Sequence, residues 1–221
     1  NKFRKELLKN KKEIASTIKN ETGKIDFDIT VEILTSLEHL KQIASIAQKA
    51  LKIQRRNAGL MKTKKAYVKY EPLGVAGVIA PWNYPLATPL TSSAEALIAG
   101  NNVLLKPSEH TPLTSKLLKK IWDNTIEYKD AFQIIIGGAD VGESIVKNNN
   151  IDIICFTGST SVGRIIAKQC AESLKPCILE LGGKDPMIVL NDANIHRAVE
   201  SAIFGGMSNA GQTCISTEEV F

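Results

Sequence analysis

The stretch "IDIICFTGSTSVGRIIAKQCAESL", residues 151–174, decides the fold, because an apolar run passes through a glycine turn into a helical pattern. Four other apolar runs stand between helical segments in the same way: "GVAGVIA" (74–80), "NNVLLKP" (101–107), "AFQIIIGG" (131–138) and "PCILELGG" (176–183). Strands that are apolar along their whole length are typical of a parallel sheet covered on both faces. Right-handed crossovers leave such a sheet little topological freedom. The sequence therefore predicts an α/β fold with a doubly wound parallel sheet.

The first 51 residues predict helices. The segment "RKELLKNKKEIASTIKNETGK", residues 4–24, has helical periodicity and stops at Gly23. A second helical pattern runs from about Phe27 to Leu51. The apolar side chains at helical spacing in the first segment are Leu7, Leu8, Ile14 and Ile18. We expect this helical segment to precede the sheet.

The charge of the chain is basic and unevenly distributed. With 28 Lys and Arg against 23 Asp and Glu the formal net charge is +5, and much of the excess lies early, in runs such as "KNKK" and "MKTKK". No RNA- or DNA-binding motif accompanies these runs, which favours a solvated helical face over a nucleic-acid site. We therefore expect no nucleic-acid partner.

The cysteines and histidines indicate neither a metal centre nor a disulfide framework. Cys155, Cys170, Cys177 and Cys214 form no CxxC pair, and the three histidines are scattered. A reducing, cytoplasmic location suits free thiols. We find no signal-peptide pattern and no apolar run long enough to span a bilayer. Because the sequence begins at Asn1 and ends in an apparent strand with no turn after it, we expect a piece of a longer protein.

Polar residues follow the first two predicted strands, at the carboxyl ends where doubly wound sheets bind ligands. In "PWNYP", residues 81–85, Asn83 offers an amide donor between two stiffening prolines, although such an Asn is also common in a purely structural turn. In "KPSE", residues 106–109, Lys106 and Glu109 suit the hydroxyls of a ribose. The alternative is that Ser108 or Glu109 caps the next helix.

Glycines follow the third and fourth predicted strands. Gly138 and Gly142 come after "IIIG", and "FTGSTSVG", residues 156–163, leads into a helix that we expect to start near Ser161. Glycines let a ligand approach the backbone, and the first amides of a helix attract a phosphate. The pattern is not GxGxxG, and a plain strand-to-helix turn is the alternative. The spacing nevertheless favours a pyrophosphate site.

A carboxylate lies on the fifth predicted strand. In "LELGGK", residues 179–184, alternation places Glu180 on the face of Ile178 and opposite Leu179 and Leu181. A carboxylate between apolar walls holds its proton more tightly and suits a general base, or it is a structural Glu paired with backbone donors. Gly182 and Gly183 then end the strand.

The last motif, "NAGQTC", residues 209–214, presents two alternatives for Cys214. The thiol is either a small packing residue or a nucleophile on a tight turn.

In order and spacing, "PWNYP", "KPSE", "FTGSTSVG", "ELGGK" and "NAGQTC" resemble the motif series of the NAD(P)-dependent aldehyde dehydrogenase superfamily. The resemblance covers nearly the whole chain, is weakest before about residue 60, and is most specific in the last three motifs. It implies a Rossmann-like domain of the aldehyde dehydrogenase type.

The resemblance implies three catalytic residues. Cys214 corresponds to the nucleophile that adds to an aldehyde carbonyl to form a thiohemiacetal. Asn83 and the backbone N–H of Cys214 correspond to the donors that hold the oxyanion. Glu180 corresponds to the base that activates water to hydrolyse the thioester.

The resemblance also implies a dinucleotide site. Lys106 and Glu109 correspond to contacts of the adenosine ribose, and Gly158 and Ser159 to the pyrophosphate site. Since Glu109 would repel a 2′-phosphate, we expect NAD rather than NADP. The other positions expected to line the site are Ile79, Pro81, Trp82, Ser108, Gly138, Gly142, Phe156, Thr157, Val162, Gly163, Leu181 and Gly182.

For the organisation of the chain, the resemblance implies an NAD-binding domain over residues 1–183 and the incomplete beginning of a catalytic domain over 184–221. The complete protein is expected to form a homo-dimer or homo-tetramer and to act on a small-molecule aldehyde. Where many members of the family read "ERV" after the cysteine, this chain has Glu218, Glu219 and Val220. Two alternatives remain open: a fragment that binds NAD without turnover, and an assembly piece that needs a partner chain.

Overall fold

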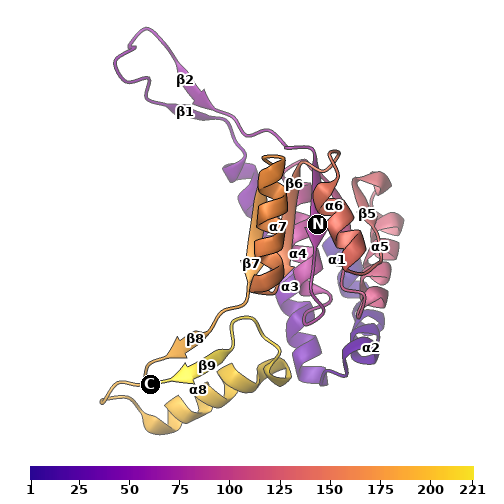
Figure 1. Ribbon diagram of the computed structural model, residues 1–221, viewed down its shortest axis with the longest axis vertical. Coiled ribbons are helices and arrows are strands. Elements are labelled where there is room, and N and C mark those ends of the chain that lie inside the picture. Colours follow the sequence, from indigo (N-terminus) through magenta and orange to yellow (C-terminus); the bar gives the residue numbers. More distant parts are fainter.

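A five-stranded parallel sheet forms the centre of the molecule (Figure 1), a computed structural model that describes residues 1–221. Its strands stand in the order β5-β4-β3-β6-β7. Their bounds are Val75–Ile79 for β3, Asn102–Lys106 for β4, Phe132–Ile134 for β5, Ile153–Gly158 for β6 and Cys177–Leu181 for β7. All four pairings are parallel, which confirms the prediction. Because the chain winds outward on one side from β3 and on the other from β6, the topological switch lies between these two strands.

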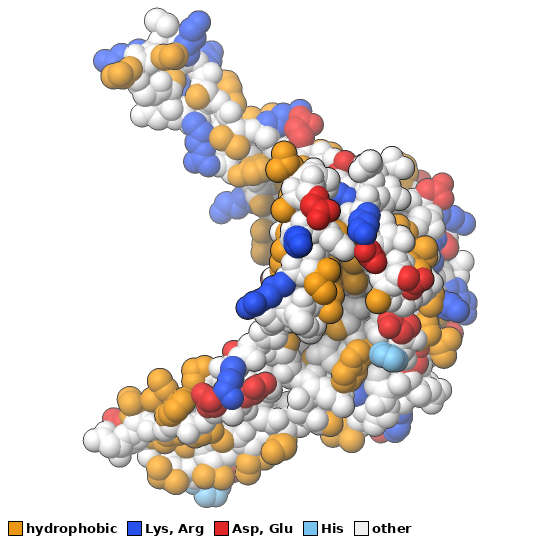
Figure 2. All heavy atoms as spheres, in the orientation of Figure 1, with side chains coloured by type: hydrophobic (Ala, Val, Ile, Leu, Met, Phe, Trp, Pro, Cys, Tyr) orange, Lys and Arg blue, Asp and Glu red, His pale blue; other side chains and the backbone are white.

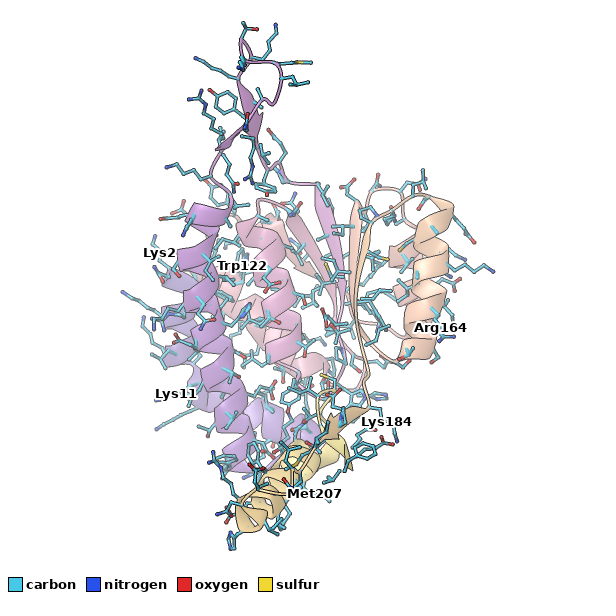
Figure 3. The ribbon with its side chains drawn as sticks, turned by 90° about the vertical axis from the view of Figure 1, so that its left-hand side faces the viewer. Lys2, Lys11, Trp122, Arg164, Lys184 and Met207 are labelled. Carbon is cyan, nitrogen blue, oxygen red and sulfur yellow. The ribbon has the colours of Figure 1, made fainter.

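Helices cover both faces of this sheet, as the apolar strands predicted. One face packs on α4 (Ala87–Ile98) and α5 (Pro112–Thr125), and the other on α6 (Ala139–Lys147) and α7 (Thr160–Glu172). Alternation along β3 separates the two cores, since Val78 lies in one and Ile79 in the other. Figure 3 shows the layers, with Trp122 on α5 and Arg164 on α7 on opposite sides of the sheet.

The three N-terminal helices form an outer layer on the α4 and α5 side. They are α1 (Lys2–Lys9), α2 (Lys11–Thr22) and α3 (Asp26–Ala50). Of the four apolar residues that the sequence places at helical spacing, Leu7, Ile14 and Ile18 are buried, whereas Leu8 is exposed. Gly23 ends α2 in the left-handed conformation, with φ of 69°, and confirms the predicted stop.

A hairpin follows α3 and extends away from the sheet (Figure 1). Its strands β1 (Gln54–Arg56) and β2 (Ala66–Val68) are antiparallel. Lysine and arginine side chains gather on this arm in Figure 2; the run "MKTKK" is solvated as predicted, but it lies in the hairpin loop and the prediction of a helical face is wrong there. The sequence did not reveal the hairpin, because strands of three residues are too short for a periodicity signal.

The chain leaves the sheet after β7 and forms a small βαβ unit, at the lower left of Figure 1. It consists of β8 (Asp185–Met187), α8 (Ile195–Met207), the 3₁₀ turn η2 (Ser208–Gly211) and β9 (Thr217–Val220), with β8 parallel to β9. No residue of α8 is buried, and its apolar stripe of Ile195, Val199, Ile203 and Met207 is exposed. Glu219, the second acidic residue of the "EEV" segment, forms an ion pair at 3.0 Å with Lys184, the residue before β8.

A 3₁₀ turn, η1 (Lys129–Ala131), precedes β5. None of the helices combines the length and the hydrophobicity that crossing a bilayer requires.

At the centre of the sheet we expect a substitution to lower the stability of the fold strongly. Ile154 on β6 is fully buried between the helices of the second core. We expect Ile154→Ala in the complete protein to lower the free energy of unfolding by about 2–5 kcal/mol, because it removes buried methyl groups and leaves a cavity. Urea denaturation measures this loss. Leu174→Ala, at a side chain that is 91% exposed, is the control and should change stability by less than about 0.5 kcal/mol. Equal losses in the two variants would contradict the assignment.

Candidate active site

A cleft of about 580 Å³ opens at the carboxyl ends of β3, β4 and β6, beside the topological switch. Parallel strands bring their carboxyl ends to one edge, so residues that are distant in sequence meet here. Most of the residues predicted to line a dinucleotide site line this cleft. They are Ile79, Pro81, Trp82, Lys106, Ser108, Glu109, Gly138, Gly142, Phe156, Thr157, Gly158, Ser159 and Val162.

The other three predicted residues lie elsewhere. Leu181 and Gly182 line an adjoining cavity of about 310 Å³, which shares Pro81, Trp82 and the 157–159 turn with the cleft. Gly163 lines neither cavity and is buried in α7. A Cβ on Gly163 would lie 2.5 Å from Leu181 Cδ2, so its structural use is to let α7 pack closely against β7.

Sequence reasoning missed the helical part of the cleft. Its lining continues along α6 at residues 139, 142, 143 and 146, and along α7 at residues 162, 165, 166 and 169. Both sets follow the i, i+3, i+4, i+7 spacing of one helix face. Extending that spacing from Gly142 and Val162 would have found Ala139, Glu143, Val146, Ile165, Ile166 and Gln169; His110 carries no such signal.

Lys106 and Glu109 form an ion pair at the end of β4. The Nζ to Oε2 distance is 3.2 Å, and the Lys106 side chain is 6% exposed whereas that of Glu109 is 48% exposed. A hydrogen bond from its own backbone amide and the neighbouring Lys106 ammonium lower the pKa of the Glu109 carboxyl. The group is therefore an anion at neutral pH, with an exposed oxygen at the cleft.

The alternative reading of "KPSE" as a helix cap is wrong. Helix α5 begins at Pro112, with Thr111 at the N-cap position. Its first free amides are bound by Glu21 of α2, whose Oε2 accepts from Thr114 N at 2.8 Å. Because Glu21 binds the free amides at the start of α5, Ser108 and Glu109 do not cap that helix and instead line the cleft.

The "FTGSTSVG" turn combines a cap with an open helix end. Ser159 is the N-cap of α7, and its Oγ accepts from Val162 N at 3.3 Å, so α7 starts at Thr160, one residue before the predicted start. The remaining first amides and the positive end of the helix dipole lie at the cleft. A Cβ on Gly158 would lie 2.5 Å from the Phe156 ring, so glycine is required where the ring folds under the turn. This arrangement fits an anionic group such as a pyrophosphate.

Cys214 follows a turn with three consecutive left-handed residues. Asn209, Ala210 and Gly211 have φ of 55°, 56° and 74°. Left-handed φ is strained for Ala and easier for Asn and Gly. The turn is held by the Asn209 amide, which is buried and donates to Asn83 O at 3.1 Å and to Gln212 O at 3.2 Å. The side chain of Cys214 is exposed beyond this turn, so the alternative that it is a packing residue is wrong.

The three predicted catalytic residues line the same cavity of about 310 Å³. Asn83 Nδ2 donates to Gln212 O at 2.8 Å, and the hydroxyl of Tyr84 lies 2.8 Å from Thr213 Oγ1. These contacts join the "PWNYP" loop to the cysteine turn across more than a hundred residues of sequence.

The surroundings of Glu180 differ from the prediction. Alternation is confirmed, because Ile178 and Glu180 share one face of β7 and Leu179 and Leu181 the other. The expectation of apolar walls is wrong, since Glu180 and Ile178 are both exposed. The cause is the position of β7 at the sheet edge, where α7 covers only the Leu179 face. The carboxylate opens onto the cavity rather than being enclosed by it.

No cluster of three His, Cys, Asp or Glu side chains is arranged to hold a metal ion.

Comparison with known proteins matches residues 1–221 to one family, the aldehyde dehydrogenase family. The chain is 41% identical over 196 residues to "Probable coniferyl aldehyde dehydrogenase" of Pseudomonas aeruginosa, covering 88% of the chain and 41% of that protein. It is 46% identical over 146 residues to benzaldehyde dehydrogenase [NAD(+)] of Pseudomonas putida, covering 66% and 30%. An NADP-dependent enzyme of E. coli superposes with a TM-score of 0.94 at 30% identity, covering 99% of this chain and 45% of that one. The chain spans less than half the length of each of these relatives.

Proposed function

This chain belongs to the aldehyde dehydrogenase family, and from that membership we propose that the complete protein oxidises an aldehyde to a carboxylate with NAD as the hydride acceptor. The observation that supports this most is one cavity that holds an exposed cysteine, an amide and a carboxylate next to a cleft suited to a dinucleotide. Of the "YPLATPL" and "FGGMSN" segments, only Tyr84 and Thr88 line the cavity, so these segments give no apolar wall that would select a class of aldehyde.

Cys214 acts as the nucleophile in this proposal. An exposed thiol on a turn that hydrogen bonds hold in place can meet a substrate carbon without rearrangement. Its sulfur adds to the aldehyde carbonyl and gives a thiohemiacetal. Bound NAD supplies the hydride acceptor that converts this adduct into a thioester.

Asn83 and the backbone amide of Cys214 stabilise the oxyanion. A side-chain amide carries two donors, and Asn83 uses one on Gln212 O. The other is available for the oxygen that becomes charged as the carbon turns tetrahedral. Donors fixed before the reaction stabilise such charge without reorganisation.

Glu180 activates the water that hydrolyses the thioester. Its carboxylate lines the same cavity as Cys214 and is open to solvent, so that a water molecule can reach it. The base takes the proton of that water as the oxygen attacks the thioester carbon, and the Cys214 thiolate leaves.

The preference for NAD rests on Glu109. Lys106 and Glu109 hold the adenosine ribose, and the first turn of α7 with Ser159 holds the pyrophosphate. Because Glu109 is an anion, a 2′-phosphate beside it would be repelled. Since relatives of this chain include enzymes named for NAD and for NADP, family membership alone leaves the cofactor open.

The proposal extends to the complete protein in three further respects. Residues 1–183 form the NAD-binding domain and residues 184–221 begin the catalytic domain, whose further elements cover the apolar stripe of α8. The complete protein forms a homo-dimer or homo-tetramer and acts in the cytoplasm. The exposed apolar stripe also fits the alternative of an assembly piece, which needs a partner chain. Turnover by the complete protein distinguishes an enzyme from such a piece and from a fragment that only binds NAD.

Replacing the nucleophile tests the central step. We expect Cys214→Ala in the complete protein to reduce aldehyde oxidation on the order of 10³-fold or more, because no other group in the cavity can form the thioester. NAD binding, measured by calorimetry, should be unchanged. Cys177→Ala, at the distant start of β7, is the matched control and should retain turnover. Turnover by Cys214→Ala would end the proposal.

Replacing the base separates the two halves of the reaction. Glu180→Gln should leave the first burst of NADH intact and slow the steady-state rate about 10²- to 10⁴-fold, because only hydrolysis needs the base. Stopped-flow absorbance measures both phases. Glu218→Gln, an exposed acid close in sequence to Cys214 that lines neither cavity, is the control. An unchanged steady-state rate in Glu180→Gln would refute its role.

Neutralising the ribose carboxylate tests the choice of cofactor. Glu109→Gln should raise kcat/KM for NADP relative to NAD about tenfold, since it removes the repulsion of a 2′-phosphate. Initial rates with both cofactors measure the ratio. Glu127→Gln, outside the cleft, should leave it unchanged. A constant ratio in Glu109→Gln would show that specificity lies elsewhere.

A further inference from the structure

A buried ion pair lies outside the cleft and takes no part in the mechanism above. Lys24 Nζ lies 2.7 Å from Glu32 Oε2, and the two side chains are 4% and 0% exposed. Lys24 stands between α2 and α3, and Glu32 is on the first half of α3. Removing two charges from water is unfavourable unless each gains further partners. The partners of this pair lead toward the cysteine turn.

The second oxygen of Glu32 caps a neighbouring helix. Glu32 Oε1 accepts from Leu86 N at 2.8 Å and from Ala87 N at 3.1 Å. These amides begin α4, whose N-cap residue provides no side-chain bond of its own. A carboxylate at a helix N-terminus satisfies free donors and complements the dipole. Because α4 follows "PWNYP" directly, Glu32 fixes the point where that loop ends.

Lys24 contacts the same loop through Tyr84. Its ammonium lies 4.2 Å from the centre of the Tyr84 ring, within the range of a cation–π contact. The far end of Tyr84 bonds to Thr213 Oγ1 at 2.8 Å, and that oxygen can donate onward to Ser208 O at 3.4 Å. With the Thr213 hydroxyl donating to the carbonyl, Tyr84 is the donor of the first bond. Burial raises the pKa of the Tyr84 hydroxyl, which keeps this donor protonated.

These contacts form one path from the N-terminal helices to the residue before Cys214. Figure 1 shows α2 at the same lower end of the molecule as the βαβ unit. The path connects these two parts, which are distant in sequence. Asn83, next to Tyr84, supports the same turn through Gln212 O and Asn209. The cysteine turn is therefore attached to residues 83 and 84, and these are attached to the ion pair.

We propose that Lys24, Glu32 and Tyr84 are positioning residues that hold the Cys214 turn against Asn83. This inference rests on the proposed role of Cys214 as the nucleophile. Lys24 and Glu32 line neither cavity, whereas Tyr84 lines the cavity of Cys214 and acts through its hydrogen bond to Thr213. Breaking the path should loosen the turn and slow the first chemical step while the adjoining NAD cleft, which none of the three residues lines, keeps its affinity.

The test is a double-mutant cycle on the hydrogen bond in the complete protein, with Tyr84→Phe, Thr213→Val and both together. Hydrogen exchange of residues 208–214 and the rate of the NADH burst are measured for each. We expect each single variant to exchange about fivefold faster in this segment and to show a burst about fivefold slower, with KM for NAD unchanged. The double variant should be no worse than Thr213→Val alone, because Tyr84→Phe removes only a bond that Thr213→Val has already removed.

The readouts separate this inference from the proposed function. If the wild-type protein oxidises no aldehyde, the proposed function fails while the exchange cycle still decides whether the path holds the turn. Unchanged exchange in Tyr84→Phe, or additive effects in the double variant, would overturn the inference. Tyr128→Phe, at an exposed tyrosine, is the matched control and should change neither readout.

A second variant examines the buried end of the path. Glu32→Gln keeps an oxygen for Leu86 N and Ala87 N but removes the counter-charge of Lys24. We expect faster exchange in residues 208–214 and a slower burst, as in Tyr84→Phe. Glu38→Gln, which breaks the exposed Lys41 pair on the same helix, is its control. If Glu32→Gln does not fold, the Tyr84 cycle decides alone; if it folds with unchanged exchange, the ion pair has no positioning role.

Discussion

The common direction of five strands is the constraint on which the rest of the structure depends. A parallel sheet brings every strand's carboxyl end to one edge, and the reversal of winding between β3 and β6 leaves a gap between the loops there. Lys106, Phe156 and Leu181 are all at or next to strand ends, so their meeting follows from topology. Neither cavity requires an unusual local conformation until the chain reaches the cysteine turn.

Capping from a distance is the second organising feature. Glu21 of α2 binds the first amides of α5, and Glu32 of α3 binds those of α4. Both helices begin just after a strand end, where a local cap would have taken up a side chain of the loop. Because the outer helices provide the carboxylates, Asn83 and Glu109 are free to face the cavities. The N-terminal layer thus contributes to the site without lining either cavity.

The sequence predicted the features that follow from periodicity or from neighbouring residues, and it missed the contacts between residues far apart in the chain. Apolar runs gave the sheet and its two covered faces, and the glycine turns together with the resemblance to a family gave most of the cleft lining. The status of "KPSE" could not be decided locally, because the residue that caps α5 is Glu21, 93 positions before Thr114. Glu180 was expected between apolar walls because its neighbours are apolar, yet strand order places β7 at an edge. Glu32 stands in ordinary helical sequence and Lys24 in the short turn before that helix, and only their burial distinguishes them.

The geometry of Cys214 depends on contact between two parts of the chain. A left-handed Ala210 costs about 1–2 kcal/mol, and Asn209 adds a smaller cost. Each hydrogen bond that the turn makes returns about 1 kcal/mol, and those from Asn83 and Tyr84 come from the sheet domain rather than from the βαβ unit. Losing both would cost the turn about 2 kcal/mol, which is comparable to the strain of its left-handed residues. Contact with the loop at residues 81–85 therefore offsets part of the strain in the turn before the Cys214 thiol, and it couples Cys214 to the same loop that borders the cleft at the switch point.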